Sequence, residues 1–354
     1  MSRRILFVIR GKLGDSLVSY ATVRRYADTY PEDSVTLLVR SNYAGLLAGE
    51  PGVRVLGFGS RLGMMALLVR LRLFEPAFDA LLVLWAFGPP VKWIGRLALA
   101  RRKVYLDGRY SSIYPEHADV PREPLQYEPM WRVARVFEPE LPAPERLHVP
   151  SLAGLRSANP RGIGIVPLAD EPRRIMDAVT LAQLVRIAQK RHPGAAVRVF
   201  VNPADSGAQA LLEAPLPVGV EFRFFPQLSD LLREFAELAH WYGTDTGLYH
   251  LAAAMGIPAT VFYGPTRPHT VMFSAQPDTN GIRLKVLGGA HCEQKHCAQP
   301  YCLYSAVAQF AGEPASGSLE ATPAECPLRL HDLPEAAGIA TYSGARELTG
   351  GGGA

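Results

Sequence analysis

Residues 241–263 read WYGTDTGLYHLAAAMGIPATVFY. The apolar run Trp241–Thr244 is typical of a short strand, and small polar residues then turn the chain into a helix predicted over Thr246–Met255. Ala259–Tyr263, rich in β-branched and aromatic residues, is predicted to be the next strand. A strand, a helix and a strand at this spacing predict two parallel strands of one sheet, with the helix packed across them.

The same alternation of short apolar strands and amphipathic helices runs twice along the chain. In the first half, the predicted strands are Arg4–Ile9, Ser34–Val39, Val53–Phe58, Asp79–Trp85 and Val104–Asp107, and the helices are Ser16–Thr29, Leu62–Phe74, Val91–Ala100 and Tyr127–Phe137. In the second half, strands over Gly162–Val166, Ala196–Val201 and Glu221–Phe225 alternate with helices over Ala178–Lys190, Asp205–Leu212 and Ser229–Leu238. This repeat predicts two parallel sheets, each covered by helices on both faces.

We therefore predict an α/β protein built from two doubly wound, Rossmann-like domains. The Pro-rich run from Glu138 to Glu145 marks the approach to their boundary, so the domains are expected over residues 1–150 and residues 151–335. The remaining residues, 336–354, end in Gly-Gly-Gly-Gly-Ala and are expected to be largely disordered. Two such domains form a cleft between the carboxyl ends of their sheets, where ligands of such folds bind.

Composition narrows the class of protein. Of 354 residues, 48% are apolar and 20% charged, which excludes a disordered or fibrous chain. No apolar run approaches the roughly 18–20 residues needed to span a bilayer, and the five apolar residues before Arg10 are too few for a signal-peptide core. We expect a cytoplasmic protein, with peripheral contact with the inner face of the cytoplasmic membrane as an alternative.

Charge is divided unevenly between the two halves. Residues 1–150 hold 21 Lys and Arg against 15 Asp and Glu, a net +6, whereas residues 151–354 hold 16 against 18, a net −2. A basic first domain indicates an anionic partner. The basic residues are dispersed and no nucleic-acid-binding motif is present, so we expect no nucleic-acid partner.

The turn after the first strand, Arg10–Leu17, reads RGKLGDSL. Gly11 and Gly14 allow a tight turn and a close approach of a ligand to the backbone. Asp15 is expected to cap the following helix, which leaves a carboxylate at the cleft; that it does nothing more than cap is the simpler interpretation. Neither the Walker pattern after Lys12 nor a dinucleotide fingerprint is present.

The turn around Asp245 is a second candidate site. The N–H groups and dipole of the helix that starts near Thr246 favour a bound anion, and His250, about one turn into this helix, is placed to reach a phosphate. The alternative is a capped core helix that carries a surface histidine. Arg267, in the turn after the next strand, is expected beside Asp245 at the same edge of the sheet.

Taken with their spacing, these residues resemble glycosyltransferase family 9, the bacterial ADP-heptose:lipopolysaccharide heptosyltransferases. The resemblance covers roughly Ile5 to Cys302, and the stretch GTDTGLYHLAAAMGIPATVFYGPTRP over residues 243–268 is its most specific part. It implies the GT-B fold, with a nucleotide-sugar donor on the second domain and the acceptor on the first. It also implies inversion at the anomeric carbon and no metal requirement.

The resemblance assigns roles to individual residues by position. Asp15 matches the catalytic base, with Gly14 and Lys12 beside it on the acceptor side. Arg174 matches a Lys that contacts the donor diphosphate, and Asp205 falls near an acidic residue that binds the adenosine ribose. The remaining donor-binding candidates are Thr244, Asp245, Thr246, Gly247 and His250.

The turn that faces the diphosphate departs from the family pattern. Hydroxyl residues that often line it are replaced by Ala169 and Asp170. A carboxylate beside a diphosphate is unfavourable unless it points away or pairs with Arg173 or Arg174. This departure bears on the donor that the chain accepts.

The four cysteines lie after residue 290. Cys292, Cys297 and Cys302 follow a C-x4-C-x4-C spacing, and Cys326 lies further on. Many members of the family that this chain resembles carry cysteines here, and one relative that modifies autotransporters holds iron with them. Because structural zinc sites usually contain a C-x2–4-C pair, reduced thiols are favoured over a structural metal.

The segment Arg61–Phe74 is both basic and apolar. One interpretation is a face that lies on an anionic membrane near a lipid-linked acceptor. The favoured one is a core helix with solvated arginines. A second basic group, consistent with a phosphorylated or carboxylated acceptor, consists of Lys92, Arg96, Arg101, Arg102 and Lys103.

We interpret the chain as an inverting, metal-independent glycosyltransferase. It is expected to move a heptose or related sugar from a nucleotide sugar, with ADP-heptose as the expected donor, to an anionic glycan or lipid-linked acceptor such as lipopolysaccharide core. Two alternatives stay open: a GT-B nucleotide-sugar epimerase, which needs only a donor, and a non-catalytic protein that binds nucleotide sugars.

Overall fold

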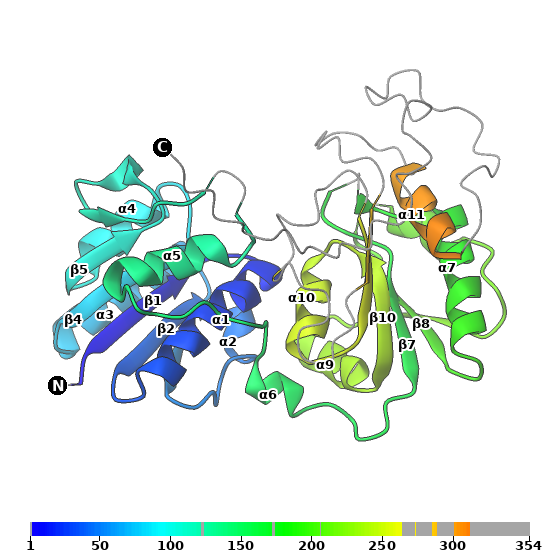
Figure 1. The fold of residues 1–354 in the computed structure, drawn as a ribbon, viewed down its shortest axis with the longest axis horizontal. Helices are drawn as coiled ribbons and strands as arrows, with labels where there is room; N and C mark the ends of the chain where they lie inside the picture. Colours follow the sequence, from blue (N-terminus) through cyan, green and yellow to red (C-terminus); the bar gives the residue numbers. More distant parts are fainter. Residues whose placement is uncertain are drawn as a thin grey trace, which may run out of the picture.

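The computed structural model describes residues 2–121, 124–171, 174–205, 207–263, 273, 285–288 and 301–311. It contains two six-stranded parallel sheets, which lie in separate lobes joined near α6 (Pro150–Ala153) (Figure 1). The predicted α/β class and GT-B arrangement of two facing Rossmann-like domains are confirmed. None of the helices in the described part of the chain is long and apolar enough to span a bilayer.

The first sheet has the strand order β3-β2-β1-β4-β5-β6. Its strands are β1 (Arg4–Ile9), β2 (Ser34–Arg40), β3 (Val53–Phe58), β4 (Phe78–Trp85), β5 (Ala100–Tyr105) and β6 (Glu116–His117). The central strand β1 buries Ile5 to Ile9 completely, as expected for a parallel strand covered on both faces.

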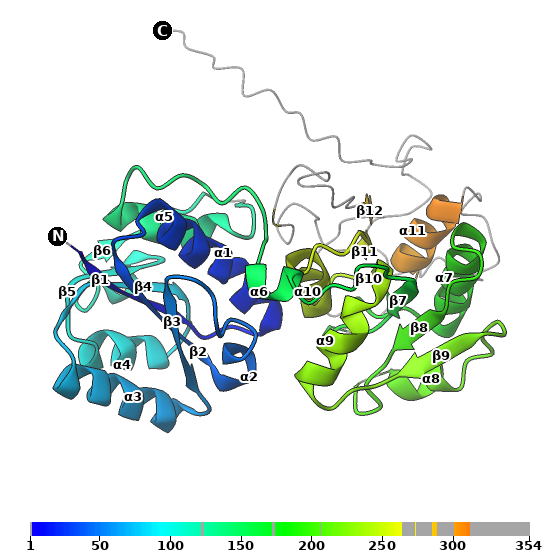
Figure 2. The same cartoon turned by 90° about the horizontal axis from the view of Figure 1, so that it is seen from below.

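Helices cover the first sheet on both sides. On one side lie α1 (Leu13–Thr29) and α5 (Glu128–Phe137), and on the other lie α3 (Arg61–Phe74) and α4 (Pro90–Leu97) (Figure 2). Two short elements, α2 (Ser41–Ala44) and the 3-10 turn Gly108–Tyr110, complete the domain.

The second sheet repeats this order as β12-β11-β10-β7-β8-β9. Its strands are β7 (Gly162–Val166), β8 (Val197–Phe200), β9 (Val220–Arg223), β10 (Leu238–Thr244), β11 (Ala259–Tyr263) and β12 (Lys285–Gly288), and its helices are α7 (Ala178–Arg191), α8 (Ala208–Leu212), α9 (Leu228–Ala236), α10 (Gly247–Ala254) and α11 (Tyr301–Ala311). In both sheets the strand order reverses beside the first strand, and such a switch point is where doubly wound folds bind ligands.

Several predicted boundaries are wrong. The helix predicted over Ser16–Thr29 begins at Leu13, because Gly14 adopts helical geometry despite its low propensity. The helix predicted over Val91–Ala100 ends at Leu97, and the strand predicted over Val104–Asp107 begins at Ala100.

The early start of β5 puts Arg101 and Arg102 on a strand. This is tolerated near the edge of the sheet because Asp79 pairs with Arg101 and Glu116 pairs with Arg102.

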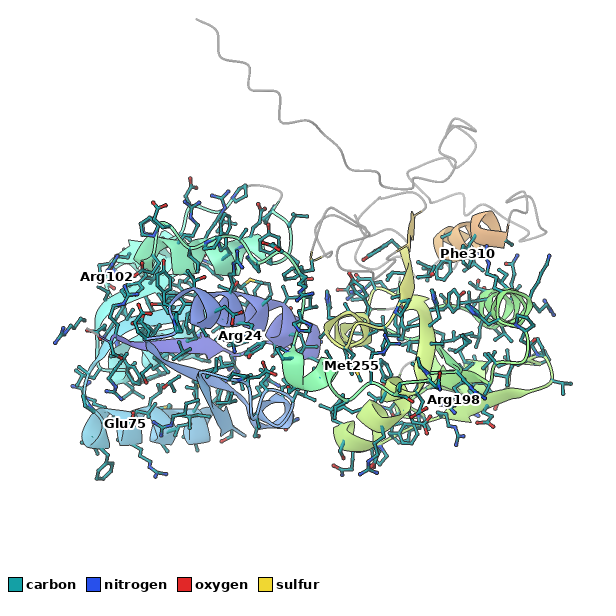
Figure 3. The ribbon with its side chains drawn as sticks, turned by 60° about the horizontal axis from the view of Figure 1, so that its bottom comes forward. Arg24, Glu75, Arg102, Arg198, Met255 and Phe310 are labelled. Atoms are coloured by element: carbon teal, nitrogen blue, oxygen red, sulfur yellow. The ribbon has the colours of Figure 1, made fainter. Side chains whose placement is uncertain are left out.

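The two domains share one apolar cluster at their junction. Side chains of the first domain pack with those of α10, and Met255, directly after α10, is fully buried between the domains (Figure 3). The connecting segment is fixed to the first domain, since the Ser151 N–H donates to the Glu50 carboxylate at 2.7 Å. The first turn of α1 packs against the first turn of α10.

Candidate active site

The N-termini of α1 and α10 meet at two glycines. A Cβ on Gly14 would lie 2.7 Å from His250 Cδ2 and 3.3 Å from Gly247 Cα, and a Cβ on Gly247 would lie 3.3 Å from the Gly14 nitrogen. Side chains at these positions would force the helices apart. Gly14, predicted on the acceptor side, and Gly247, predicted on the donor side, are thus in direct contact where the two domains meet.

Asp15 lies in the first turn of α1, just beyond this contact. Its Oδ2 accepts a hydrogen bond from the Lys12 N–H at 3.0 Å. Asp15 was expected to cap the helix, but Lys12 occupies the N-cap position and Asp15 is the third helical residue. The carboxylate therefore accepts a hydrogen bond from the N–H of the N-cap residue from within the first turn of the helix, because α1 starts earlier than the sequence pattern indicates.

Burial shifts the acidity of Asp15. The carboxylate is packed beneath Gly11 and the Trp85 ring, and a Cβ on Gly11 would lie 2.3 Å from Asp15 Cβ. Desolvation raises the pKa of Asp15, partly offset by hydrogen bonds from Lys12 and Trp85 and by the Lys12 charge. A carboxylate with a raised pKa in a cleft is suited to accept a proton.

Lys12 and Asp170 form an ion pair between the domains, with Lys12 Nζ 2.6 Å from Asp170 Oδ2. Asp170 was expected to pair with Arg173 or Arg174 or to point away. It pairs with Lys12, while Arg173 lies outside the described residues. Both side chains are largely exposed, so the pair adds little stability, but it links the acceptor-side turn to the donor-side turn.

Arg174 is held at the carboxyl end of β10 by Asp245. Its Nη1 lies 2.8 Å from Asp245 Oδ2 and 3.2 Å from the Asp245 carbonyl oxygen, while Nη2 lies 3.1 Å from Glu171. The buried Asp245 carboxylate thus fixes the guanidinium beside the first turn of α10. Arg174 Nε is buried and has no hydrogen-bond partner among the described residues.

His250 is buried at the junction, so the alternative of a surface histidine is wrong. Only 3% of its surface is exposed, and desolvation lowers its pKa to about 3. The ring is therefore neutral near pH 7. Its Nδ1 is buried and has no hydrogen-bond partner in the described part of the structure.

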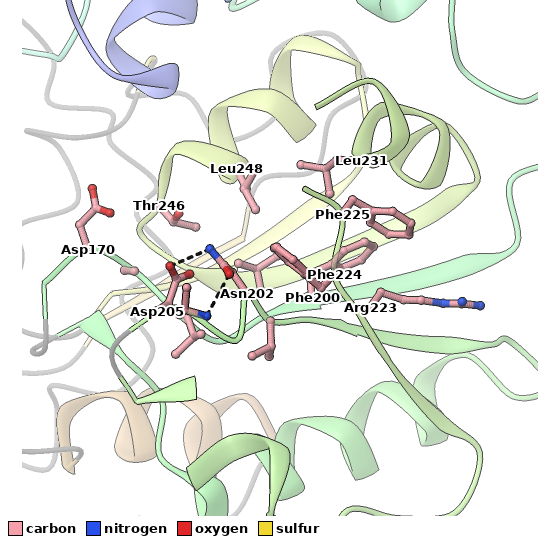
Figure 4. A pocket seen from close by; sticks show the side chains of 15 residues that line it. Asp170, Phe200, Asn202, Asp205, Arg223, Phe224, Phe225, Leu231, Thr246 and Leu248 are labelled. Atoms are coloured by element: carbon pink, nitrogen blue, oxygen red, sulfur yellow. Dashed lines mark hydrogen bonds between the residues drawn. The ribbon is translucent and has the colours of Figure 1, made fainter. Parts of the chain in front are cut away.

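A cavity of about 460 Å³ opens beside this junction in the second domain (Figure 4). Two of the predicted donor-binding residues, Asp205 and Thr246, line it together with Asp170. Asn202 Nδ2 donates to Asp205 Oδ1 at 3.0 Å, and burial, followed by the Asp170 charge, raises the pKa of Asp205. Thr246 is also the N-cap residue of α10, so the cavity extends to the N–H groups of that helix.

One wall of the cavity was not predicted. Strand β9 ends at Arg223 rather than at Phe225, so Phe224 and Phe225 lie after the strand and line the cavity with Phe200. The Phe-Phe-Pro sequence at the carboxyl end of a predicted strand was the available signal. Aromatic rings beside a carboxylate and an amide are suited to a nucleoside, whose base stacks and whose ribose hydroxyls donate.

Other candidates lie away from the cavity or outside the described residues. Thr244 is fully buried in β10 and does not line the cavity. Its Oγ1 has no hydrogen-bond partner among the described residues. Arg267, Cys292, Cys297 and Cys326 lie outside the described residues, as does the Cys302 side chain. Within the described ranges, no three His, Cys, Asp or Glu side chains are grouped to hold a metal ion.

A model of glycosyltransferase family 9 (heptosyltransferase) matches residues 145–302. No curated protein matches the sequence.

Several solved structures share the fold of the chain. A glycosyl transferase family 9 from Veillonella parvula superposes with a TM-score of 0.71 and 13% identity, over 88% of this chain and 97% of that one. E. coli heptosyltransferase WaaC, solved with ADP, gives a TM-score of 0.66 and 17% identity, over 87% and 99%. E. coli ADP-heptose lps heptosyltransferase II gives 0.61 and 19%, over 80% and 90%.

At these identities, the likeness to solved structures establishes the fold. The match to the family model covers residues 145–302, which include Arg174, the donor-side cavity and the first turn of α10. The match and the shared fold confirm the resemblance noted from residues 243–268. Residues 145–302 therefore match a glycosyltransferase family 9 (heptosyltransferase) domain, and the chain shares the fold of solved heptosyltransferases.

Proposed function

We propose that the chain transfers a heptose or related sugar, with inversion, from an ADP-linked donor to an anionic glycan or lipid-linked acceptor such as lipopolysaccharide core. The observation that carries the proposal is the position of Asp15. Its carboxylate has a raised pKa and lies in the first turn of α1, which packs on the first turn of α10. A proton acceptor on one domain and an anion-binding helix on the other are the two requirements of such a transfer.

The donor half of the proposal is supported by the cavity in the second domain. The aromatic wall is suited to stack an adenine, and Asp205, fixed by Asn202, is suited to accept hydrogen bonds from ribose hydroxyls. From there the cavity reaches Thr246, so the diphosphate of the same ligand would meet the N–H groups of α10.

The reaction requires charge to move from the acceptor to the leaving diphosphate. Asp15 takes the acceptor hydroxyl proton while the oxygen attacks the anomeric carbon from the face opposite the diphosphate. The growing negative charge is stabilised by the Arg174 guanidinium and the N-terminus of α10. His250 is neutral, so it contributes a hydrogen bond rather than a positive charge.

The cation on the donor side supports a reaction that needs no divalent metal. Arg174 is oriented by the buried Asp245 at 2.8 Å and supplies a fixed positive charge at the expected position of the diphosphate. The sequence contains no Asp-x-Asp run of the kind that would hold a divalent ion on the diphosphate. We therefore propose that turnover persists after chelation.

The test is an assay with ADP-heptose, with and without a lipopolysaccharide-core acceptor, repeated in EDTA. We expect ADP release that depends on the acceptor, a product of inverted anomeric configuration, and an unchanged rate in EDTA. Conversion of the donor alone would identify an epimerase, and nucleotide binding without turnover would identify a non-catalytic protein. Activity lost in EDTA and restored by Mg²⁺ or Mn²⁺ would overturn the metal-independent mechanism.

A further inference from the structure

Helix α3 is apolar on two opposite sides. Its inner side buries Met64, Leu68 and Leu71 against the first sheet. On its outer side, Leu62 is 76% exposed, Leu73 is 68% exposed, and Val69 is exposed between them. Spacings of seven and four residues place these three side chains on one stripe of the helix. A core helix with solvated arginines accounts for the inner side of α3 only.

The outer stripe continues onto α4. Helices α3 and α4 lie side by side on the same side of the first sheet (Figure 2), and Arg72 Nη1 donates to the Arg96 carbonyl oxygen at 3.2 Å. Phe74 is 79% exposed at the end of α3, and Trp93 is exposed on α4. These apolar side chains and the cations among them are called the α3–α4 surface. Its apolar members are Leu62, Val69, Leu73, Phe74 and Trp93, and its cations are Arg61, Arg70, Arg72, Lys92 and Arg96.

This part of the chain holds the excess positive charge of the first domain. Between residues 60 and 106 there are eight Lys and Arg and two Asp and Glu, a net +6. Both carboxylates are already paired, since Glu75 binds Arg4 and Arg54 while Asp79 binds Arg101. The cations of the α3–α4 surface are therefore not neutralised by these carboxylates.

The basic group that was expected to bind an acceptor is divided by the fold. Arg102 pairs with Glu116, and Lys103 donates to the Gly95 carbonyl oxygen. Lys92 and Arg96 point outward on α4 and have no ion-pair partner within the described ranges, and the same holds for Arg61 and Arg70 on α3. Cations that form no ion pair with a described residue thus flank the apolar stripe on both helices.

We propose that the α3–α4 surface binds the surface of an anionic phospholipid membrane. An apolar stripe of leucines with Phe and Trp, bordered by Arg and Lys, is the arrangement of helices that lie in a membrane interface. The apolar side chains enter the boundary between headgroups and acyl chains, and the cations meet lipid phosphates. The core of a protein–protein interface is depleted of charge, whereas four unpaired cations stand within and around this stripe.

The α3–α4 surface contains no residue of the proposed transfer reaction, but a loop connects it with the Asp15 region. The loop from β4 to α4 carries the half-exposed Phe87, and β4 ends at Trp85 beside Gly11 and Asp15. A membrane bound by α3 and α4 would lie along the side of the first domain that carries these helices. The loop from β4 to α4 connects that side with Trp85, which lies beside Asp15. The binding does not require that Asp15 be the catalytic base.

The test is co-sedimentation of the full chain with phosphatidylcholine vesicles, with and without phosphatidylglycerol. We expect binding only to the vesicles with phosphatidylglycerol, weakened by added salt. The pair Leu73→Glu and Phe74→Glu should reduce partitioning on the order of a hundredfold, because two inserted apolar side chains are lost. Arg70→Glu with Arg96→Glu should reduce it by about 25-fold or more.

The matched control is Val218→Glu, which changes a 97% exposed apolar residue of the second domain in the same way. It should partition like the unchanged protein. All substituted residues are exposed, so circular dichroism and melting temperature should be unaltered. The proposal is overturned if the unchanged protein ignores both vesicles, which would assign the surface to a protein partner, or if the Leu73 and Phe74 variant binds as well as the control.

Discussion

Two glycines set how closely the domains approach. Gly14 and Gly247 allow the first turns of α1 and α10 to touch, which brings Asp15 toward the helix that is proposed to hold the donor diphosphate. Glycine weakens a helix by roughly 1 kcal/mol relative to alanine, so two glycines in first turns are a local cost. The close approach of the backbones explains why that cost is tolerated.

Replacing Gly14 with alanine tests this contact. The new Cβ would lie 2.7 Å from His250 Cδ2, so the junction must open. We expect a lower melting temperature, since overpacking costs about 1–3 kcal/mol, and a transfer rate reduced by up to about 100-fold. Thermal unfolding and the transfer assay measure the two effects.

The control is Gly63→Ala in α3, where the nearest atom to the new Cβ is Ser60 Oγ at 3.4 Å, an ordinary contact. That variant should be as stable as the unchanged protein or up to about 1 kcal/mol more stable. An unaltered melting temperature and rate in Gly14→Ala would show that the junction is looser than the structure indicates.

At the scale of elements, the second domain has a histidine layer between α7 and β10. His192, at the end of α7, bonds the Tyr242 hydroxyl at 2.8 Å, and His240 bonds Thr260 Oγ1 at 2.9 Å. The two imidazole rings are 5.5 Å apart. Desolvation, the other histidine and Arg191 lower the pKa of His240 to about 4, and desolvation and Arg191 lower the pKa of His192.

These shifts make the fold sensitive to acid. In the unfolded chain these histidines become protonated near pH 6.5, whereas in the folded chain His240 stays neutral until about pH 4. The free energy of unfolding should therefore fall as the pH drops from 6.5 toward 4, by up to about 1.4 kcal/mol per pH unit from His240, and His192 acts in the same direction. Urea unfolding at several pH values measures this slope.

His240→Gln removes one titrating group and retains a partner for Thr260. The slope of its free energy of unfolding against pH, between pH 6.5 and 4, should correspond to about one proton fewer taken up on unfolding than in the unchanged protein. Equal slopes would mean that His240 does not couple folding to pH. His117→Gln, on an exposed side chain of the first domain, is the control and should retain the full slope.

The sequence predicts most elements closely, for a physical reason. Apolar runs such as Arg4–Ile9 and Gly162–Val166 must be strands buried on both faces, and the structure has them with the predicted bounds. The start of α1 was missed because Gly-Lys-Leu-Gly, residues 11–14, has the composition of a turn. The basic strand β5 was missed because Asp79 and Glu116, which pair with its arginines, are distant in sequence.

At the scale of the whole molecule, the site arises from two sheets with the same strand order. In each sheet the strand order reverses beside the first strand, β1 in one domain and β7 in the other. Helix α1 follows β1, and α10 follows β10, the neighbour of β7 at the reversal. The sequence could place Asp15 and Thr246 at those edges, since each follows a predicted strand. It could not predict that Lys12 pairs with Asp170, because that contact depends on how the two domains face each other.

The central claim is that Asp15 is the base for sugar transfer, and Asp15→Asn tests it most directly. Asn can still accept the hydrogen bond from the Lys12 N–H, so stability should change by less than about 1 kcal/mol. Donor affinity should hold, since the cavity lies in the second domain. Asp28→Asn, near the other end of α1, is the control and should keep the full rate.

The decisive measurement is the rate of acceptor-dependent ADP release by Asp15→Asn, at an unchanged melting temperature. An amide cannot take a proton near neutral pH, so the rate should fall by about 10²–10⁴-fold relative to the unchanged protein and to Asp28→Asn. A rate equal to that of the control would contradict the account and leave Asp15 as a residue that only stabilises the first turn of α1.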